Sequence, residues 1–174
     1  MSETHIAHLN AGRLRADWDD PLVADFVAAL GHVNAIATRS AGFVWRFSDA
    51  DMETAQDDPA GLWRGDPRVA ATLSVWRSVE DLRHFVHDTL HGAFLRRRAE
   101  WFEPPDGPAY VIWPIQAGHI PGLAEAAERL AHLAAYGPSA WAFDFGWAGR
   151  QTADTAPNPA ILGANRPLRT DGAQ

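Results

Sequence analysis

Residues 69–102, VAATLSVWRSVEDLRHFVHDTLHGAFLRRRAEWF, contain the strand and the helix that decide the fold. The first eight residues place apolar or small side chains on both faces, which predicts a buried strand. Ser78 then begins a helix, with Asp81 at the third position of a capping box. The helix is expected to continue to about Trp101, so that a strand passes directly into a long helix.

Further strands and helices follow from the two-residue alternation and from the helical spacing of apolar side chains. In chain order they are expected at residues 5–11 (strand), 21–39 (helix), 42–47 (strand), 110–116 (strand), 121–136 (helix) and 141–145 (strand). The acidic segment 49–67, which is interrupted by proline and glycine, is expected to be a loop. The order is β-α-β-β-α-β with an extra C-terminal helix and strand, which is the ferredoxin-like plan of an α+β protein.

The strands of this plan are apolar on both faces, although two helices cover only one face of such a sheet. A second copy of the chain, packed sheet against sheet, would cover the other face. We therefore expect a homodimer that forms a dimeric α/β barrel. Residues 1–147 form the predicted domain, and residues 148–174, which hold no aromatic residue, are expected to be an extended or disordered tail.

The composition of the chain excludes several kinds of chemistry. The 174 residues include no cysteine and no lysine. The chain therefore cannot form disulfides, thiol nucleophiles, thiolate zinc sites, Schiff-base lysines or P-loop lysines. Nor does it contain a G-x-S-x-G, H-E-x-x-H or Walker A motif.

Charge and hydropathy limit the expected partners and location. A net charge of −7 disfavours nucleic acid, and the three arginines at 96–98 point in three directions on a helix. The N-terminus lacks the basic and apolar regions of a secretory signal. The apolar runs are expected to be too short to span a bilayer. We expect a cytoplasmic protein whose partner is a small molecule, with no membrane or nucleic-acid partner.

Several short motifs resemble the DUF3291 family. They are HLNAGRL at 8–14, GFVWR at 42–46, LSVW at 73–76, the pattern FV-x4-H-x3-LRRR-x-EWF at 85–102, AGH at 117–119 and GPS at 137–139. The resemblance covers about residues 5–146. It implies a dimeric α/β-barrel fold related to the antibiotic-biosynthesis monooxygenase superfamily, in a family that is itself named for an unknown function.

His91 and Asn10 are the candidate catalytic residues. Imidazole titrates near neutral pH and needs no cofactor, so His91, which fits the family pattern, is expected to act as general acid or base. An amide such as that of Asn10 can hold a substrate oxygen or tie down the backbone of a loop. The candidate substrate-binding residues are Trp45, Trp76, Trp101, Asn34 and Arg13, of which Arg13 could instead form a surface ion pair.

The histidines of the long helix support an alternative with a haem or a divalent metal. His84, His87 and His91 follow one another at spacings of three and four, which bring side chains to one side of a helix. His87 and His91 are the candidate ligands, and an exposed polar face is the simpler explanation. Haem-degrading relatives in the superfamily use a tryptophan and a histidine at positions that align with Phe85 and Leu95 here, which argues against haem degradation.

Three functions remain open from the sequence. Superfamily resemblance implies a small-molecule enzyme with an apolar pocket, either a cofactor-independent monooxygenase or a cyclase or isomerase. Its substrate would be aromatic or polyketide-like, and a histidine would take the proton. The alternatives are a haem- or metal-binding protein and a non-catalytic ligand-binding or assembly protein, in which the eight tryptophans form an interface.

Overall fold

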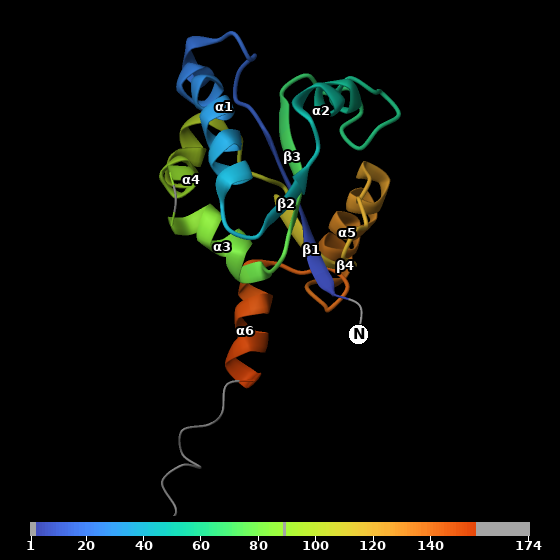
Figure 1. The fold of residues 1–174 in the computed structure, drawn as a ribbon. Helices are drawn as coiled ribbons and strands as arrows, with labels where there is room; N and C mark the ends of the chain where they lie inside the picture. Colours follow the sequence, from blue (N-terminus) through green and yellow to red (C-terminus); the bar gives the residue numbers. More distant parts are fainter. Residues whose placement is uncertain (1–2, 89, 156–174) are drawn as a thin grey trace, which may run out of the picture.

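A four-stranded antiparallel sheet lies at the centre of the molecule (Figure 1). The computed structural model describes residues 3–88 and 90–155, with side chains for residues 3–88 and 92–151. The strands are β1 (Thr4–Arg13), β2 (Phe43–Arg46), β3 (Val69–Trp76) and β4 (Tyr110–Gln116). Their order in the sheet, β2-β3-β1-β4, is that of a ferredoxin-like fold, so the predicted fold class is confirmed.

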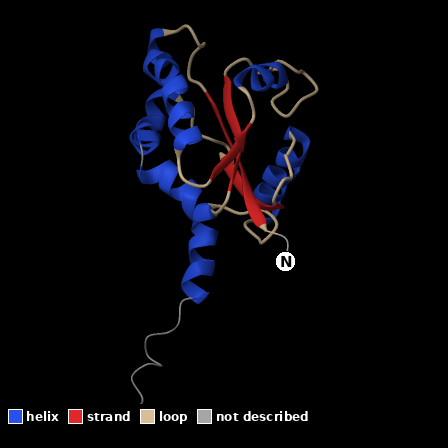
Figure 2. Ribbon diagram, viewed as in Figure 1, coloured by secondary structure: helices blue, strands red, loops and turns tan. Residues whose placement is uncertain are grey.

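Helices lie on both sides of this sheet (Figure 2). They are η1 (Pro21–Val23), α1 (Ala24–Arg39), α2 (Asp49–Gln56), α3 (Val79–Asp88), α4 (Leu90–Trp101), α5 (Leu123–Tyr136) and α6 (Phe145–Thr155). Helices α1, α3 and α4 lie on one side, and α2 and α5 lie on the other (Figure 1). We call these two sides of the sheet the α1 face and the α5 face.

The α5 face is covered by helices of the same chain. Its core joins Leu9 and Leu73 of the sheet to Met52 of α2 and to Ala126 and Leu133 of α5. A second copy of the chain was expected to cover one face, and that reason for a dimer does not hold for the described residues. The homodimer itself stays a prediction, which light scattering of the purified chain would check.

Two segments differ from the expected elements for local reasons. Residues 49–56 form α2 rather than a loop because Ser48 caps it: the Ser48 hydroxyl accepts from the Asp51 amide (3.1 Å) and donates to the Asp51 carboxylate (2.6 Å). The expected single helix to Trp101 is divided into α3 and α4. A side chain at Gly92 would collide with the carbonyl oxygen of His87, so glycine permits the close approach of the two helices.

The C-terminal part of the domain also departs from expectation. The strand expected at 141–145 is reduced to single bridges, Ile112 with Phe143 and Ser139 with Ala142. The predicted boundary after residue 147 falls inside α6, which continues to Thr155. The extended or disordered tail predicted for residues 148–174 is wrong for residues 148–155, which are helical, and its remainder, residues 156–174, lies outside the described residues.

The segment Pro21–Arg39 is, by length and composition alone, long and apolar enough to cross a membrane. This corrects the expectation that the apolar runs are too short to span a bilayer. In the structure the segment instead lies beside the sheet, and Phe26, Leu30 and Val33 of α1 line a cavity there.

A polar network joins α5 to the sheet. The Trp113 indole donates to one oxygen of the Glu125 carboxylate (2.8 Å), and a His119 ring nitrogen lies 2.7 Å from the other oxygen. Burial raises the pKa of Glu125, but the hydrogen bonds with His119 and Trp113, together with the nearby charges of His119 and Arg129, outweigh this and leave the pKa below its usual value. The carboxylate form of Glu125 is therefore favoured by folding.

We expect Glu125→Gln to destabilise the protein at pH 7 and not at low pH. A carboxyl group whose pKa is lowered by folding adds stability above its unfolded pKa, and loses it as the pH falls through the folded pKa. The variant should melt about 2–4 °C below wild type at pH 7, the shift typical of about 1 kcal/mol in a chain of this size. The difference should narrow as the pH falls through the lowered pKa of Glu125. Exposed Glu128 on the same helix provides the control Glu128→Gln, and a gap that does not change as the pH is lowered would contradict the assignment.

Candidate functional site

A cavity of about 680 Å³ lies mainly on the α1 face of the sheet, and residues of α2 also line it. It occupies the space between two apolar clusters on that face. One cluster is built around Trp76 and Phe85, and the other around Trp101 and Phe102. A volume of this size is typical of sites that bind small molecules or cofactors.

The floor of the cavity is polar. His8 and Asn10 alternate onto the same face of β1, where they pair in register with Ser74 and Thr72 of β3. His8 is buried, and its ring meets the Tyr110 ring edge to face at 5.9 Å between centroids. The sheet thus presents an imidazole, an amide and two hydroxyl groups between the two apolar clusters.

The walls of the cavity are mainly apolar. Helix α1 contributes Phe26, Leu30, Val33 and Ala37, which recur every three or four residues and so lie on one side of the helix. Helix α4 contributes Phe94, Leu95, Arg98 and Trp101. Aromatic and aliphatic walls over a polar floor favour a ligand with an extended apolar body and few polar groups.

Four of the predicted site residues line this cavity: Asn10, Asn34, Trp76 and Trp101. The Asn34 amide donates to the Asp49 carboxylate (3.3 Å), which also accepts two hydrogen bonds from Arg46 (2.7 and 3.1 Å). The hydrogen bond from Arg46 lowers the pKa of Asp49 despite partial burial. The Asn34 side chain therefore joins α1 to α2 beside the cavity. The side-chain amide of Asn10, in contrast, has no hydrogen bond to another described residue.

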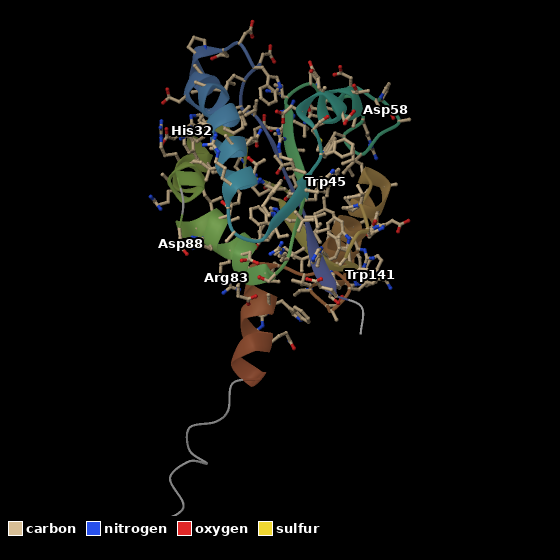
Figure 3. The ribbon with its side chains drawn as sticks, in the orientation of Figure 1. His32, Trp45, Asp58, Arg83, Asp88 and Trp141 are labelled. Atoms are coloured by element: carbon tan, nitrogen blue, oxygen red, sulfur yellow. The ribbon has the colours of Figure 1, made fainter. Side chains whose placement is uncertain are left out.

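Arg13 and Trp45 were predicted at the same site, but the structure places them outside this cavity. Arg13 points to the α5 face because it is an odd-numbered residue of β1, and it forms ion pairs with Asp66 (2.7 Å) and Glu103. Trp45 of β2 (Figure 3) packs against the core of the α5 face, with its ring edge to face with Phe47 at 5.9 Å. The ion-pair alternative for Arg13 is the correct one.

The helix histidines do not come together with other ligands in the part of the chain that is described. His84 is exposed and lies 3.1 Å from Asp88 at the end of α3 (Figure 3). His87 is exposed beside the Phe145 ring at 5.4 Å. No group of three His, Cys, Asp or Glu side chains that could hold a metal occurs among the described residues. The His91 side chain lies outside the described residues, so its catalytic and metal roles stay predictions.

His8 and Arg98 are among the polar residues of the cavity that were not predicted as site residues. His8 lies on the same face of β1 as Asn10. The two-residue alternation along this strand was therefore the signal that could have identified His8 as a cavity residue. Arg98 was treated as one of a run of arginines on a helix. Its guanidinium is partly buried in the cavity wall, and that burial lowers its pKa.

The fold and this cavity define a ferredoxin-like α+β protein with space for one small molecule between the sheet and its helices. The chain belongs to the DUF3291 family, a domain of unknown function, whose family model matches residues 5–158. This confirms the resemblance seen in the sequence. A comparison with curated protein sequences found no match.

Several solved structures are similar to this chain. The NE2512 protein of unknown function from Nitrosomonas europaea has 12% identity and a TM-score of 0.43, over 70% of this chain and 99% of its own. SnoaB, a cofactor-independent oxygenase from Streptomyces nogalater, has 11% identity and a TM-score of 0.40, over 67% and 95%. A candidate antibiotic biosynthesis monooxygenase from Nitrosomonas europaea has 14% identity and a TM-score of 0.42, over 70% and 97%.

Proposed function

We propose that the protein is an enzyme that removes a proton from an aromatic or polyketide-like small molecule in the cavity of the α1 face. The observation that carries the proposal is the combination of a cavity of about 680 Å³ with an imidazole and an amide side by side on its floor. Imidazole is the side chain best suited to take a proton near neutral pH. No cofactor is needed for this step.

His8 and Asn10 have complementary roles in this proposal. His8 takes a proton from a carbon next to a carbonyl group, and the Asn10 N–H donates to the carbonyl oxygen, on which the negative charge of the enolate develops. The two side chains lie two residues apart on β1, a separation of about 6–7 Å. His91, the base predicted from the sequence, is the second candidate for the proton acceptor.

An enolate or phenolate formed in this way can continue along two routes. If O₂ enters the cavity, the electron-rich carbon can react with it, and the enzyme is a cofactor-independent oxygenase. If the proton returns to another carbon, or if the carbanion attacks a carbonyl group of the same molecule, the enzyme is an isomerase or cyclase. Both routes begin with the same proton transfer.

Anthrone tests the proposal because it is an elongated three-ring ketone with an acidic CH₂ group. We expect the wild-type protein to accelerate exchange of that CH₂ with D₂O under argon, followed by NMR. The variant His8→Gln should lose about 100-fold or more of the acceleration, the usual contribution of a general base. Asn10→Ala should lose about 10-fold or more, since it removes one donor to the developing oxyanion.

The control variants distinguish the role of His8 from that of His91. His32→Gln, an exposed histidine on α1 (Figure 3), should leave the exchange rate unchanged. If His91→Gln abolishes exchange and His8→Gln does not, the proton acceptor is His91 and our assignment of His8 is wrong. If anthrone is converted to anthraquinone and water with consumption of one O₂, the oxygenase route is supported; exchange without O₂ uptake supports the isomerase or cyclase route.

The haem or metal alternative has a direct test. A Soret band after addition of haem, or stoichiometric metal in the purified protein, would support it, and loss of that signal in His87→Ala and His91→Ala would locate it on α3 and α4.

An assembly role predicts instead that neither anthrone nor related ring systems alter the tryptophan fluorescence. The cytoplasmic location stays a prediction.

A further inference from the structure

Arg98 reaches from α4 to the edge of β1 and forms part of the cavity wall. Its Nη2 lies 3.3 Å from the Ala11 carbonyl oxygen, to which it donates. Its guanidinium lies over the Phe102 ring, 4.8 Å from the centroid. One backbone carbonyl and one aromatic face therefore hold the cation, and they leave most of its five N–H donors for other partners.

Gly12 makes room for this arrangement. A Cβ at this position would lie 2.6 Å from Arg98 Nη2 and 2.7 Å from a carbon of the Phe102 ring. Any other residue at position 12 would push the guanidinium or the ring away from β1. The glycine in the HLNAGRL motif thus permits the close contact of Arg98 with the strand, at the end of the cavity floor.

Arg98 differs from Arg97 in having no carboxylate partner among the described residues. The adjacent Arg97 forms ion pairs with Asp25 (2.9 Å) and Glu100 (2.8 Å) on the surface. Arg98, in contrast, is partly buried, where an unpaired cation is costly. Its position in the cavity wall is where an anionic group of a ligand would offset that cost.

Carboxylates also line part of the cavity, and they do not neutralise Arg98. Asp49, Glu53 and Asp57 come from α2 and the residue after it, and all three are exposed to solvent. Asp49 is already paired with Arg46 (2.7 Å). Exposed charges are screened by water and salt, so they oppose the binding of an anion less than a partly buried guanidinium favours it.

We propose that Arg98 binds the carboxylate, or an equivalent anionic oxygen, of an elongated ring-containing substrate whose body extends along the cavity floor. The inference rests on the proposed function and adds the class of substrate. Along β1, His8 is four residues from Gly12, a span of about 13 Å. A molecule of about three fused rings, anchored at Arg98, can therefore reach Asn10 and His8 with its far end.

Anthracene-2-carboxylate and its neutral amide, anthracene-2-carboxamide, form a matched pair of probes. We expect wild-type protein to bind the carboxylate at least about 10-fold more tightly than the amide, as measured by quenching of tryptophan fluorescence, since charge-assisted hydrogen bonds are the stronger ones. Arg98→Gln should reduce the preference to about twofold or less, and Arg98→Lys should retain part of it. Arg97→Gln, one residue away on the surface, should leave the preference unchanged.

The outcomes separate this inference from the proposed function. If wild-type protein binds both probes equally, Arg98 is not an anion site, although the cavity still binds ring systems. If neither probe binds, the cavity function fails and the inference fails with it. The comparison of the two probes on wild-type protein needs no variant, so equal binding overturns the inference even if Arg98→Gln does not fold, and Arg98→Lys then provides the variant that assigns the site. A preference for the carboxylate that survives in folded Arg98→Gln would also overturn the inference.

Discussion

Replacing Trp113 by alanine is expected to lower the free energy of unfolding by about 3–5 kcal/mol, the usual cost of deleting a large aromatic side chain from a core. Trp113 has no exposed surface and packs in the core of the α5 face, between β4 and α5. Its indole also donates to the Glu125 carboxylate (2.8 Å), which would lose this partner. Urea denaturation followed by circular dichroism measures the change.

Trp113→Phe separates the packing from the hydrogen bond. Phenylalanine keeps most of the apolar contact and removes the N–H donor to Glu125, so it should cost about 1–2 kcal/mol, well below the alanine variant. Trp113 faces away from the cavity, so the folded Trp113→Phe protein should bind anthracene-2-carboxylate as wild type does. A loss of stability in Trp113→Ala below about 1 kcal/mol would mean that α5 does not cover this face in solution.

The ferredoxin-like plan could be predicted from the order of strands and helices along the chain, and the two-residue period of β1 and β3 assigns each side chain to a face of the sheet. Each side chain on β1 has a defined face, and the register that pairs His8 with Ser74 follows from burying Leu9 and Leu73 on the other side. The cavity floor was therefore implicit in the sequence pattern. Nothing in that pattern indicates how far α1 lies above the sheet, and so the cavity itself could not be predicted.

The division into α3 and α4 could not be predicted from hydrophobic spacing. Gly92 alone is an ambiguous signal, since one glycine inside a helix is tolerated. Its importance comes from the collision that a side chain would make with the His87 carbonyl, a contact that exists only in the folded chain. Arg98 was missed for a related reason. What distinguishes it from Arg97 is its hydrogen bond to the Ala11 carbonyl oxygen, which lies in a segment far away in the sequence.

The expected dimer was inferred from a count of helices that was too low. Ser48 and Asp51 begin α2 in a segment that composition assigned to a loop, and α2 places Met52 in the core of the α5 face. Helix α5, predicted from Pro121 onward, was not assigned to a face at all. Both helices together supply the cover for which the sequence argument needed a second copy of the chain.

Gly42→Ala is expected to destabilise the protein by about 2–4 kcal/mol, because it combines a backbone penalty with a collision. Gly42 has a φ of +73°, where a Cβ costs about 1–2 kcal/mol. The added Cβ would also overlap the Asp81 side chain, which accepts from the Ser78 hydroxyl (2.8 Å). Displacing Asp81 breaks the cap at the start of α3, which is worth about 1 kcal/mol.

Gly118→Ala is the matched control for this prediction. Gly118 has a φ of +89°, and no atom lies within 4 Å of the Cβ that would be added, so this variant has the backbone penalty without the collision. The two variants should therefore differ by about 1–2 kcal/mol in urea denaturation. Asp81→Ala in the Gly42→Ala background removes the side chain that the new Cβ meets, and it should add little further destabilisation, since the cap is already lost. Equal effects of Gly42→Ala and Gly118→Ala would mean that β2 does not approach the start of α3 as closely as described.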